Sequence, residues 1–156
     1  MSERLPHLNE KGEAHIVDVG AKPVTARRAV ARAVLEAQPA TITAIATSSL
    51  KKGDALAVAR IAGIMAAKKT SDLIPLCHPI GLNKVEVDIK VEGGTLVVLA
   101  TAETNDRTCV EMEAMTAASV AALTLYDMAK GMDRAMRVST IELMEKSGGK
   151  SGDFRR

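Results

Sequence analysis

The chain has 156 residues, a formal net charge of +2, 47% hydrophobic residues and only 1% aromatic residues. That length fits a single domain over 1–156, which can bury roughly two-thirds of its unfolded surface. Nucleic-acid binding is not expected, because the charge is small and aromatic rings for base stacking are nearly absent. Two cysteines give no disulfide framework, and neither a signal peptide nor an apolar run of membrane length is evident. We therefore expect a cytoplasmic protein that does not contact membranes.

The N-terminal third of the chain predicts one strand and one helix. The β-branched run 14–20 ends at a glycine, which favours a strand. Residues 25–37 are dominated by alanine, valine and arginine and end just before a proline, so they predict a helix with Thr25 as its N-cap. Residues 41–49 fit either a short strand or a helical turn, and both alternatives stay open.

The middle of the chain predicts a helix followed by a hairpin. Asp54 can cap a helix over 55–67, which ends at two lysines near its negative dipole end. Two prolines make the segment 71–79 irregular. Polar and apolar residues then alternate over 84–91, and a Gly-Gly turn leads to a second strand over 95–104.

A long helix is predicted over 108–131. Thr108 and Glu111 have the spacing of a capping box, and Gly131 stands where a left-handed C-terminal residue is expected. Three- and four-residue steps define its buried face, which comprises Val110, Ala114, Ala117, Ala121, Leu125 and Met128.

The last strand is predicted over 137–145. The termini 1–12 and 147–156 are expected to be flexible, the second because it is rich in glycine and lysine. The order of elements contains the β-α-β-β-α-β motif with one extra helix in the first crossover. It predicts an α+β fold, a ferredoxin-like antiparallel sheet with helices packed on one face. The other face of the sheet and the alanine-rich helices favour self-association.

The Cys77-His78 pair allows several interpretations. A metal site is not expected, because the two ligands are adjacent and the remaining histidines and cysteine lack a zinc spacing. His78 stands in a proline-pinned loop, where it either contacts a substrate or simply forms a local hydrogen bond. For Cys77, a half-buried structural thiol is favoured over a nucleophile.

Two lysine-containing segments have the composition of anion sites. Lys146 and Lys150 flank a pair of glycines, although Met144 replaces the first glycine of a phosphate-binding loop. Lys52 and its neighbouring lysine precede a predicted helix N-terminus, where phosphate binds well. A disordered tail and ordinary surface lysines are the alternatives.

The long helix carries ionisable residues at both ends. Glu111 and Glu113 favour its positive end, and Asp127 and Lys130 form an i,i+3 pair at the other end. Each residue alone has a structural explanation. Together with the loop lysines and His78, however, they are what binding a polyphosphate and transferring protons beside it require.

Several segments of the chain are uncommon, namely LIPLCHP at 73–79, VEMEA at 110–114, AASVAAL at 117–123, LYDM at 125–128 and KSGGKSGDF at 146–154. Together they resemble the MoaC family of molybdenum-cofactor biosynthesis. The similarity extends from 12–19 nearly to the C-terminus and includes 52–54 and 59–64.

The resemblance implies a specific reaction. The substrate is expected to be 3′,8-cyclo-7,8-dihydro-GTP, and the products cyclic pyranopterin monophosphate and pyrophosphate. No redox cofactor is expected, and Mg²⁺ could assist at the phosphates. Family members are hexamers, described as trimers of dimers, with sites at subunit interfaces.

The resemblance also assigns site residues. The expected catalytic residues are Asp127, Lys130 and Lys52. The expected substrate-binding residues are Leu76, Cys77, His78, Met112, Glu113, Glu111, Lys146, Lys150 and Arg27, of which Lys150 comes from the anion-site interpretation of the tail. One departure is Cys109, which replaces the glycine expected before Val-Glu-Met-Glu.

The two ends of the long helix are too far apart for their side chains to meet within one chain. Glu113 and Asp127 are 14 positions apart, or roughly 21 Å along a helix. We therefore expect one site to combine the Asp127 end of one subunit with the Glu113 end of another. A non-catalytic regulator that binds GTP-like nucleotides on the same fold is the alternative function, and a purely structural oligomer is a third.

Overall fold

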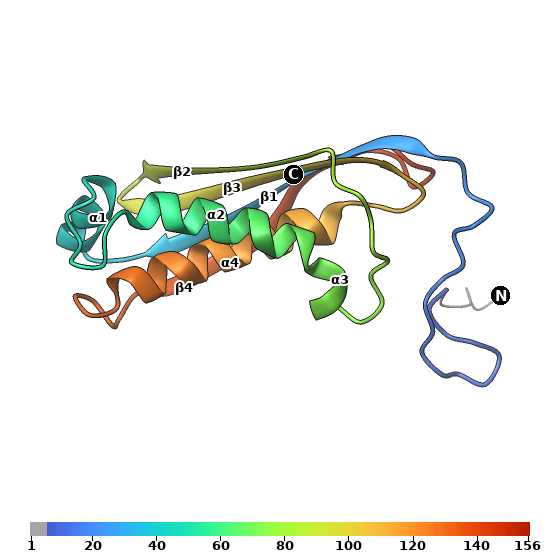
Figure 1. The fold of residues 1–156 in the computed structure, drawn as a ribbon, viewed down its shortest axis with the longest axis horizontal. Coiled ribbons are helices and arrows are strands. Elements are labelled where there is room, and N and C mark those ends of the chain that lie inside the picture. The colour runs from blue at the N-terminus through green and yellow to red at the C-terminus, as the bar shows by residue number, and fades with distance from the viewer. Residues whose placement is uncertain (1–5) are drawn as a thin grey trace.

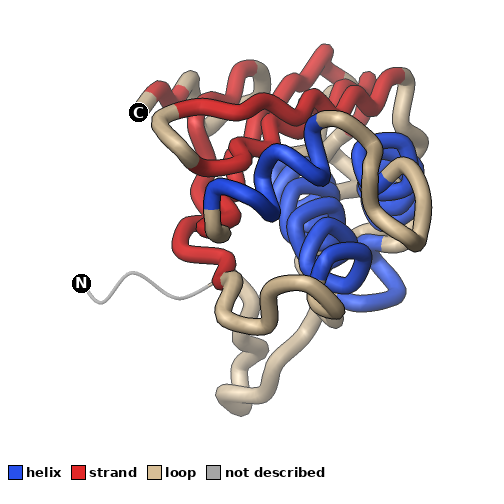
Figure 2. The backbone as a smooth tube through the Cα atoms, turned by 90° about the vertical axis from the view of Figure 1, so that its left-hand side faces the viewer, coloured by secondary structure: helices blue, strands red, loops and turns tan. Residues whose placement is uncertain are grey.

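The computed structural model describes residues 6–156, which form an antiparallel sheet with helices on one of its faces (Figures 1 and 2). The strands are β1 (Thr25–Glu36), β2 (Lys84–Glu92), β3 (Thr95–Asp106), β4 (Arg137–Ser147) and β5 (Phe154–Arg155). The helices are α1 (Pro39–Ala46), α2 (Ala55–Lys68), α3 (Thr70–Leu73) and α4 (Glu111–Ala129). The strand order β2-β3-β1-β4-β5 confirms the ferredoxin-like α+β fold.

The helix predicted over 25–37 is wrong, because these residues form the central strand β1. Ala29, Ala31, Ala33 and Leu35 are fully buried, and the residues between them face the other side of the sheet. The strand is paired along its length with β3 on one side and β4 on the other. The high helix propensity of alanine misled the prediction, since a central strand needs small side chains where helices pack closely on it.

The strand predicted over 14–20 is wrong as well. This stretch contains one isolated bridge, between Leu8 and Ala14, and otherwise runs without regular structure toward β1. The predicted N-cap role of Thr25 fails with the helix, since Thr25 begins β1. The predicted order of elements still holds, because α1 supplies the helix that was expected at 25–37 and settles the ambiguity at 41–49.

The hairpin and the second helix are confirmed. The Asp54 side chain accepts a hydrogen bond from the Ala57 amide at 3.1 Å, which caps α2. Gly93 and Gly94 both have positive φ angles, 56° and 76°, and connect β2 to β3. The irregular segment 71–79 begins within the one-turn helix α3.

The long helix α4 is confirmed, but both of its predicted caps are wrong. Val110 is the N-cap residue and Thr108 lies outside the helix, so no capping box forms. Gly131 does not have a positive φ, and Lys130 ends the helix in a right-handed conformation. Five of the six residues predicted for the buried face of α4 have 2% exposure or less, and Met128 is half-buried.

Close packing against α2 fixes the direction of α4. A Cβ atom on Gly63 would lie 3.0 Å from the carbonyl oxygen of Ala117, so a larger residue would push the two helices apart by a few tenths of an ångström. Both helices run along the sheet, and the two ends of α4 therefore lie far apart along its length (Figure 1).

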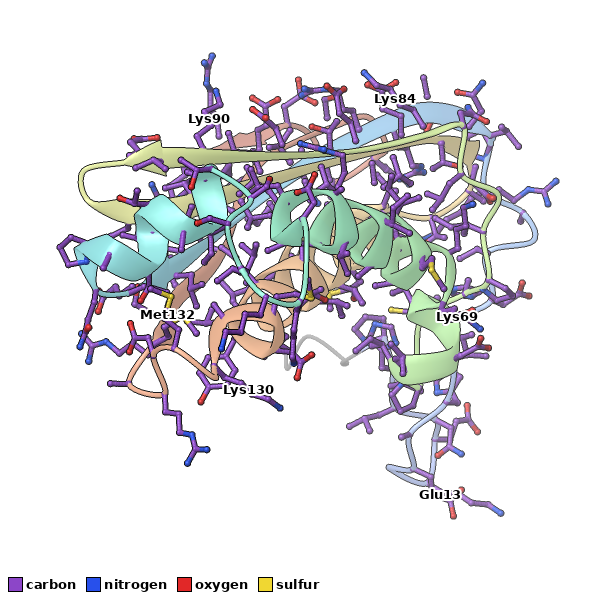
Figure 3. All side chains as sticks on the ribbon, turned by 60° about the vertical axis from the view of Figure 1, so that its left-hand side comes forward. Glu13, Lys69, Lys84, Lys90, Lys130 and Met132 are labelled. Carbon is purple, nitrogen blue, oxygen red and sulfur yellow. The ribbon has the colours of Figure 1, made fainter. Side chains whose placement is uncertain are left out.

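The N-terminal arm lies beyond one end of the sheet, and the C-terminal tail turns at that end and runs back along the sheet (Figure 1). This arm includes Glu13 and extends away from the helices (Figure 3). Part of the expected flexible segment 1–12, namely 1–5, lies outside the described residues. The C-terminal tail returns to the sheet, where Phe154 of β5 pairs with Lys146 of β4. Within 6–156, no helix is long and apolar enough to cross a membrane.

Candidate functional site

The structure separates the predicted site residues into two clusters at the two ends of α4. We call them the Glu113 cluster and the Asp127 cluster. The Glu113 cluster contains Arg27, Leu76, Cys77, His78, Glu111, Met112, Glu113, Lys146 and Lys150. The Asp127 cluster contains Lys52, Asp127 and Lys130.

A cavity of about 300 Å³ lies at the start of α4 in the Glu113 cluster. Its walls come from the N-terminal arm, the loop after α3 and the first turn of α4. The lining residues are Pro6, His7, Val17, Val19, Lys22, Leu76, Cys77, His78, Thr108, Cys109, Glu111, Met112 and Glu113. The structure thus brings together three segments that are distant in the sequence, two of which the resemblance had assigned to one substrate.

Glu113 is the buried ionisable group of this cavity, with 4% exposure. Burial raises the pKa of its carboxyl group to about 7, and the nearby negative charge of Asp106 contributes in the same direction. A carboxyl group with a pKa of about 7 can give or take a proton at neutral pH. Glu113 is therefore suited to proton transfer as well as to hydrogen bonding with a ligand.

The two residues of the Cys77-His78 pair have different environments. Burial, reinforced by the charge of Glu113, raises the pKa of the Cys77 thiol, which keeps it protonated and weakly nucleophilic. This agrees with a structural thiol. The Nε2 atom of His78 is 2.6 Å from the carbonyl oxygen of Val17, so it donates a hydrogen bond that orients the ring at the cavity wall. Both interpretations of His78, a local hydrogen bond and a substrate contact, fit this position.

A second cavity of about 370 Å³ adjoins the first and is lined by four cationic residues. Its lining comprises Lys22, Arg27, Arg107, Thr108, Cys109, Lys150 and Ser151, with no carboxylate among these residues. The two cavities share Lys22, Thr108 and Cys109. Such a concentration of Lys and Arg donors suits a polyphosphate.

Arg27 is the buried cation of the second cavity, with 8% exposure. Its guanidinium donates to the carbonyl oxygens of Asp106, at 3.0 Å, and Arg107, at 3.2 Å, and so supports the turn before α4. Gly149 has a φ of 85°, and a Cβ atom there would collide with the guanidinium of Arg27. The left-handed backbone and this contact both favour a glycine where the tail crosses Arg27.

Lys146 connects the tail to the start of α4. Its Nζ atom is 2.5 Å from a carboxylate oxygen of Glu111 and 3.1 Å from the hydroxyl oxygen of Ser151. The hydrogen bond to Glu111 raises the pKa of Lys146, which stays protonated. Glu111 thus forms an ion pair with Lys146 in place of the predicted capping box with Thr108.

Cys109 fits without backbone strain where a glycine was expected. The φ angle of Cys109 is not positive; among the non-glycine residues of 6–156, only Ser48 has a positive φ. Its Sγ atom lies 3.7 Å from an Arg27 nitrogen and 4.0 Å from the Lys146 ammonium group. Cys109 therefore lines both cavities and does not need the left-handed backbone that favours glycine.

Sequence reasoning missed Lys22 and Arg107 as members of this site. Neither belongs to a recognisable motif, and their cavity depends on the fold of the arm and the tail. The Arg107 Nε atom donates to the Lys22 carbonyl oxygen at 3.2 Å, which links the two segments. A sequence signal did exist for Arg107, namely a cation just before the N-terminus of the long helix.

The Asp127 cluster is an exposed carboxylate between two lysines. Lys130 Nζ lies 2.8 Å from Asp127 Oδ1, which confirms the predicted i,i+3 pair. Lys52 Nζ lies 2.8 Å from the Asp127 carbonyl oxygen and 3.4 Å from Oδ2. Figure 3 shows Lys130 at this end of α4. The sequence around Lys52 does not predict its contact with Asp127, because the two residues are 75 positions apart.

The lysines shift the pKa of Asp127 downward, with Lys130 as the main cause and Lys52 as the second. The hydrogen bond to Asp127 raises the pKa of Lys130. A lysine acting as a base would need a lowered pKa, and Lys130 shows the opposite shift in the single chain. At neutral pH, Asp127 is therefore ionised and Lys130 protonated.

A third cavity, of about 530 Å³, adjoins Lys52 at this end of the molecule. It is lined by Ala44, Ser49, Leu50, Lys51, Lys52, Met128, Ala129, Gly131 and Met132. The Asp127 cluster thus stands beside a largely apolar hollow, yet roughly 21 Å along α4 from Glu113.

A metal site was not expected. Across 6–156, no three His, Cys, Asp or Glu side chains come together in a group that could hold a metal ion. The expectation that the chain binds no metal of its own stays a prediction.

Comparison with known proteins assigns the family. The model described as "MoaC family" matches residues 16–149. The chain belongs to the MoaC family. The match covers both clusters except Lys150, so the residues that the resemblance singled out lie within the MoaC region.

Relatives of nearly the same length support this assignment. A protein of Parvibaculum lavamentivorans named cyclic pyranopterin monophosphate synthase is 57% identical, over 99% of this chain and 98% of the relative. A protein of the same name from Thermomicrobium roseum is 54% identical, over 97% of this chain and 93% of the relative. Cyclic pyranopterin monophosphate synthase 1 of Mycobacterium bovis is 56% identical, over 97% of this chain and 90% of the relative.

Proposed function

We propose that this chain converts 3′,8-cyclo-7,8-dihydro-GTP to cyclic pyranopterin monophosphate with release of pyrophosphate, a step of molybdenum-cofactor biosynthesis. One observation carries the proposal: a cationic cavity adjoins a cavity that contains a buried carboxyl group with a pKa of about 7. The substrate has two corresponding parts: a triphosphate, which suits the cationic cavity, and a purine-derived ring system, which suits the cavity with the carboxyl group. The names of the MoaC relatives favour this activity over the non-catalytic regulator.

The cationic cavity holds the phosphates in this proposal. Lys22, Arg27, Arg107 and Lys150 neutralise the triphosphate. A substrate hydroxyl attacks the α-phosphorus and gives its proton to a general base, a P–O bond forms, and the bond to the β-phosphate breaks to release pyrophosphate. Negative charge grows on this leaving group, and the fixed cations stabilise it.

The carboxyl groups serve the ring chemistry. Opening the purine-derived ring and rebuilding it as a pyranopterin requires proton transfers. Glu113 can give or take a proton near neutral pH, and ionised Asp127 can accept one while Lys52 and Lys130 supply positive charge. Leu76, Cys77, His78 and Met112 form the wall against the ring system.

The complete site belongs to an oligomer in this proposal. The Asp127 cluster of one subunit faces the Glu113 cluster of another, within a hexamer arranged as a trimer of dimers. The separation of the clusters supports a shared site. An uncovered apolar surface on the helices supports assembly: Val58, Ile61 and Met65 of α2 and Leu123 of α4 are 45–59% exposed.

The proposal includes no redox cofactor and no membrane or nucleic-acid partner. If Mg²⁺ assists, it binds through the substrate's phosphates, a common mode for this ion. The small-molecule substrate derives from GTP, so we place the reaction in the cytoplasm.

The test is to incubate the protein with the cyclised GTP derivative and to follow both pyrophosphate and the pterin product. Formation of both in equal amounts is the expected result. Binding of the compound without formation of either product would contradict the proposal and support the non-catalytic regulator.

A further inference from the structure

We propose that Asp133 is a positioning residue that holds Lys52 against Asp127. Only the expected effect on turnover rests on the proposed function, because the position of Lys52 can be measured without any substrate. Asp133 lies in the turn between α4 and β4 and is 5% exposed. It is therefore shielded from a ligand and acts through other residues.

The Asp133 carboxylate connects this turn to the start of α1. Its Oδ2 atom accepts hydrogen bonds from the Gln38 amide at 2.9 Å and the Thr41 hydroxyl at 3.2 Å. Its Oδ1 atom accepts from the Ala135 amide at 3.2 Å. A buried carboxylate is costly unless its oxygens are hydrogen-bonded in this way.

Asp133 also supplies what α1 lacks in its own sequence. The N-cap residue of α1 is Gln38, whose side chain forms no capping hydrogen bond, and the first turn contains no acidic residue. The Asp133 carboxylate thus provides both a hydrogen-bond acceptor and a negative charge at the positive end of this eight-residue helix.

The loop at the other end of α1 carries Lys52. This loop is tied back to the helix by the Ser49 amide, which donates to the Ala44 carbonyl at 3.0 Å. A second turn forms where the Gly53 amide donates to the Leu50 carbonyl at 3.0 Å. The position of Lys52 is therefore coupled to the position of α1.

The contacts form a closed ring that begins and ends on α4. The Asp133 amide donates to the Ala129 carbonyl at 3.2 Å, which ties the turn to α4. The carboxylate holds α1, α1 carries the loop, and Lys52 Nζ returns to the Asp127 carbonyl at 2.8 Å. Without the Asp133 carboxylate, α1 loses its N-terminal anchor and Lys52 loses its fixed distance from Asp127.

The experiment compares Asp133→Ala and Asp133→Asn in the wild-type chain and in a Lys52→Met background. The first readout is the pKa of Asp127, measured by carbon NMR of its carboxyl group in the full-length protein. Lys52 and Lys130 are the charges that hold this pKa down. The second readout is kcat and KM for the cyclised GTP derivative.

We expect Asp133→Ala to raise the pKa of Asp127 to the value found in Lys52→Met, and to lower kcat roughly ten- to hundredfold. Asp133→Asn retains one acceptor oxygen and should produce a smaller change in the same direction. In the Lys52→Met background, Asp133→Ala should change neither the pKa nor kcat further.

The control is Ile89→Ala, which removes a buried side chain of β2 that takes no part in this ring of contacts. It should lower the melting temperature without shifting the pKa of Asp127. If Asp133→Ala does not fold, Thr41→Val removes one of the two α1 hydrogen bonds and should raise this pKa slightly.

The proposal is overturned if the pKa of Asp127 stays unchanged in the folded Asp133 and Thr41 variants, or if the effects of Asp133→Ala and Lys52→Met on kcat multiply. A shifted pKa in a protein that turns over no substrate would support the positioning role and contradict the proposed function.

Discussion

Glu113 and Asp127 lie on nearly the same face of α4 but in opposite environments. Glu113 is 4% exposed, and burial raises its pKa to about 7. The Asp127 side chain is 58% exposed, and Lys130 and Lys52 lower its pKa. Two carboxyl groups whose pKa values are pushed apart can act as acid and base in one reaction. Within one chain the two residues are roughly 21 Å apart along α4, too far for their side chains to meet.

Asp127→Asn should remove turnover and leave folding intact. The substitution removes the charge that Lys52 and Lys130 contact, and loss of a general base typically slows a reaction about 10²- to 10⁴-fold. Rates of pyrophosphate release and circular dichroism spectra give the comparison. Asp88→Asn, which replaces an exposed β2 carboxylate paired with Lys90, is the matched control and should keep full activity. Near-normal turnover by the folded Asp127→Asn variant would remove Asp127 from the mechanism.

Glu113→Gln should stabilise the protein more at pH 8 than at pH 5. The pKa of this carboxyl group is about 7 in the folded chain and near 4.5 in the unfolded chain, so burial of its charge destabilises the wild type increasingly between those values. The penalty is absent below pH 4.5 and reaches at most about 3 kcal/mol above pH 7. The glutamine side chain carries no charge, so the Glu113→Gln variant does not have this penalty. Urea unfolding at both pH values measures the difference.

The same stability gain at pH 5 and pH 8 would show that Glu113 titrates normally. Glu92→Gln, at an exposed end of β2, provides the control and should change stability little at either pH.

Gly149→Ala should weaken phosphate binding more than Gly152→Ala does. Both glycines have a positive φ, 85° and 78°, so both variants carry similar backbone strain. A Cβ atom at Gly149 also collides with the Arg27 guanidinium, whereas a Cβ atom at Gly152 meets open space. Calorimetric titration with inorganic pyrophosphate compares the two affinities. Equal losses in both variants would mean that the contact between the tail and Arg27 does not shape the anion site.

The order of elements could be predicted from the sequence, although two of its N-terminal elements were misassigned. Polar–apolar alternation identified β2, because one of its faces is exposed to solvent, and the Gly-Gly turn that follows identified β3. In β1, small buried residues alternate with larger residues on the other face. In the sequence this pattern resembles that of an alanine-rich helix. Only pairing with β3 and β4 on both sides decides in favour of the strand.

The candidate site was predicted as a set of residues, but its division into cavities was not. The segments around His78 and Glu113 line one cavity, and both were singled out because they match motifs of the MoaC family. Lys22 and Arg107 were missed, since loops without regular structure bring them together. The burial of Glu113 and Asp133 was also not evident, because the charge pattern of a sequence does not show depth.

The most direct test of a shared site is to mix Asp127→Asn subunits with Glu113→Gln subunits, each inactive alone, under conditions that allow exchange. Random assembly gives a site with wild-type Asp127 from one subunit and wild-type Glu113 from another in roughly a quarter of cases. We therefore expect pyrophosphate release to recover to roughly a quarter of the wild-type rate. No recovery, with exchange verified by mass spectrometry of differently labelled subunits, would contradict the account and place all essential groups within one chain.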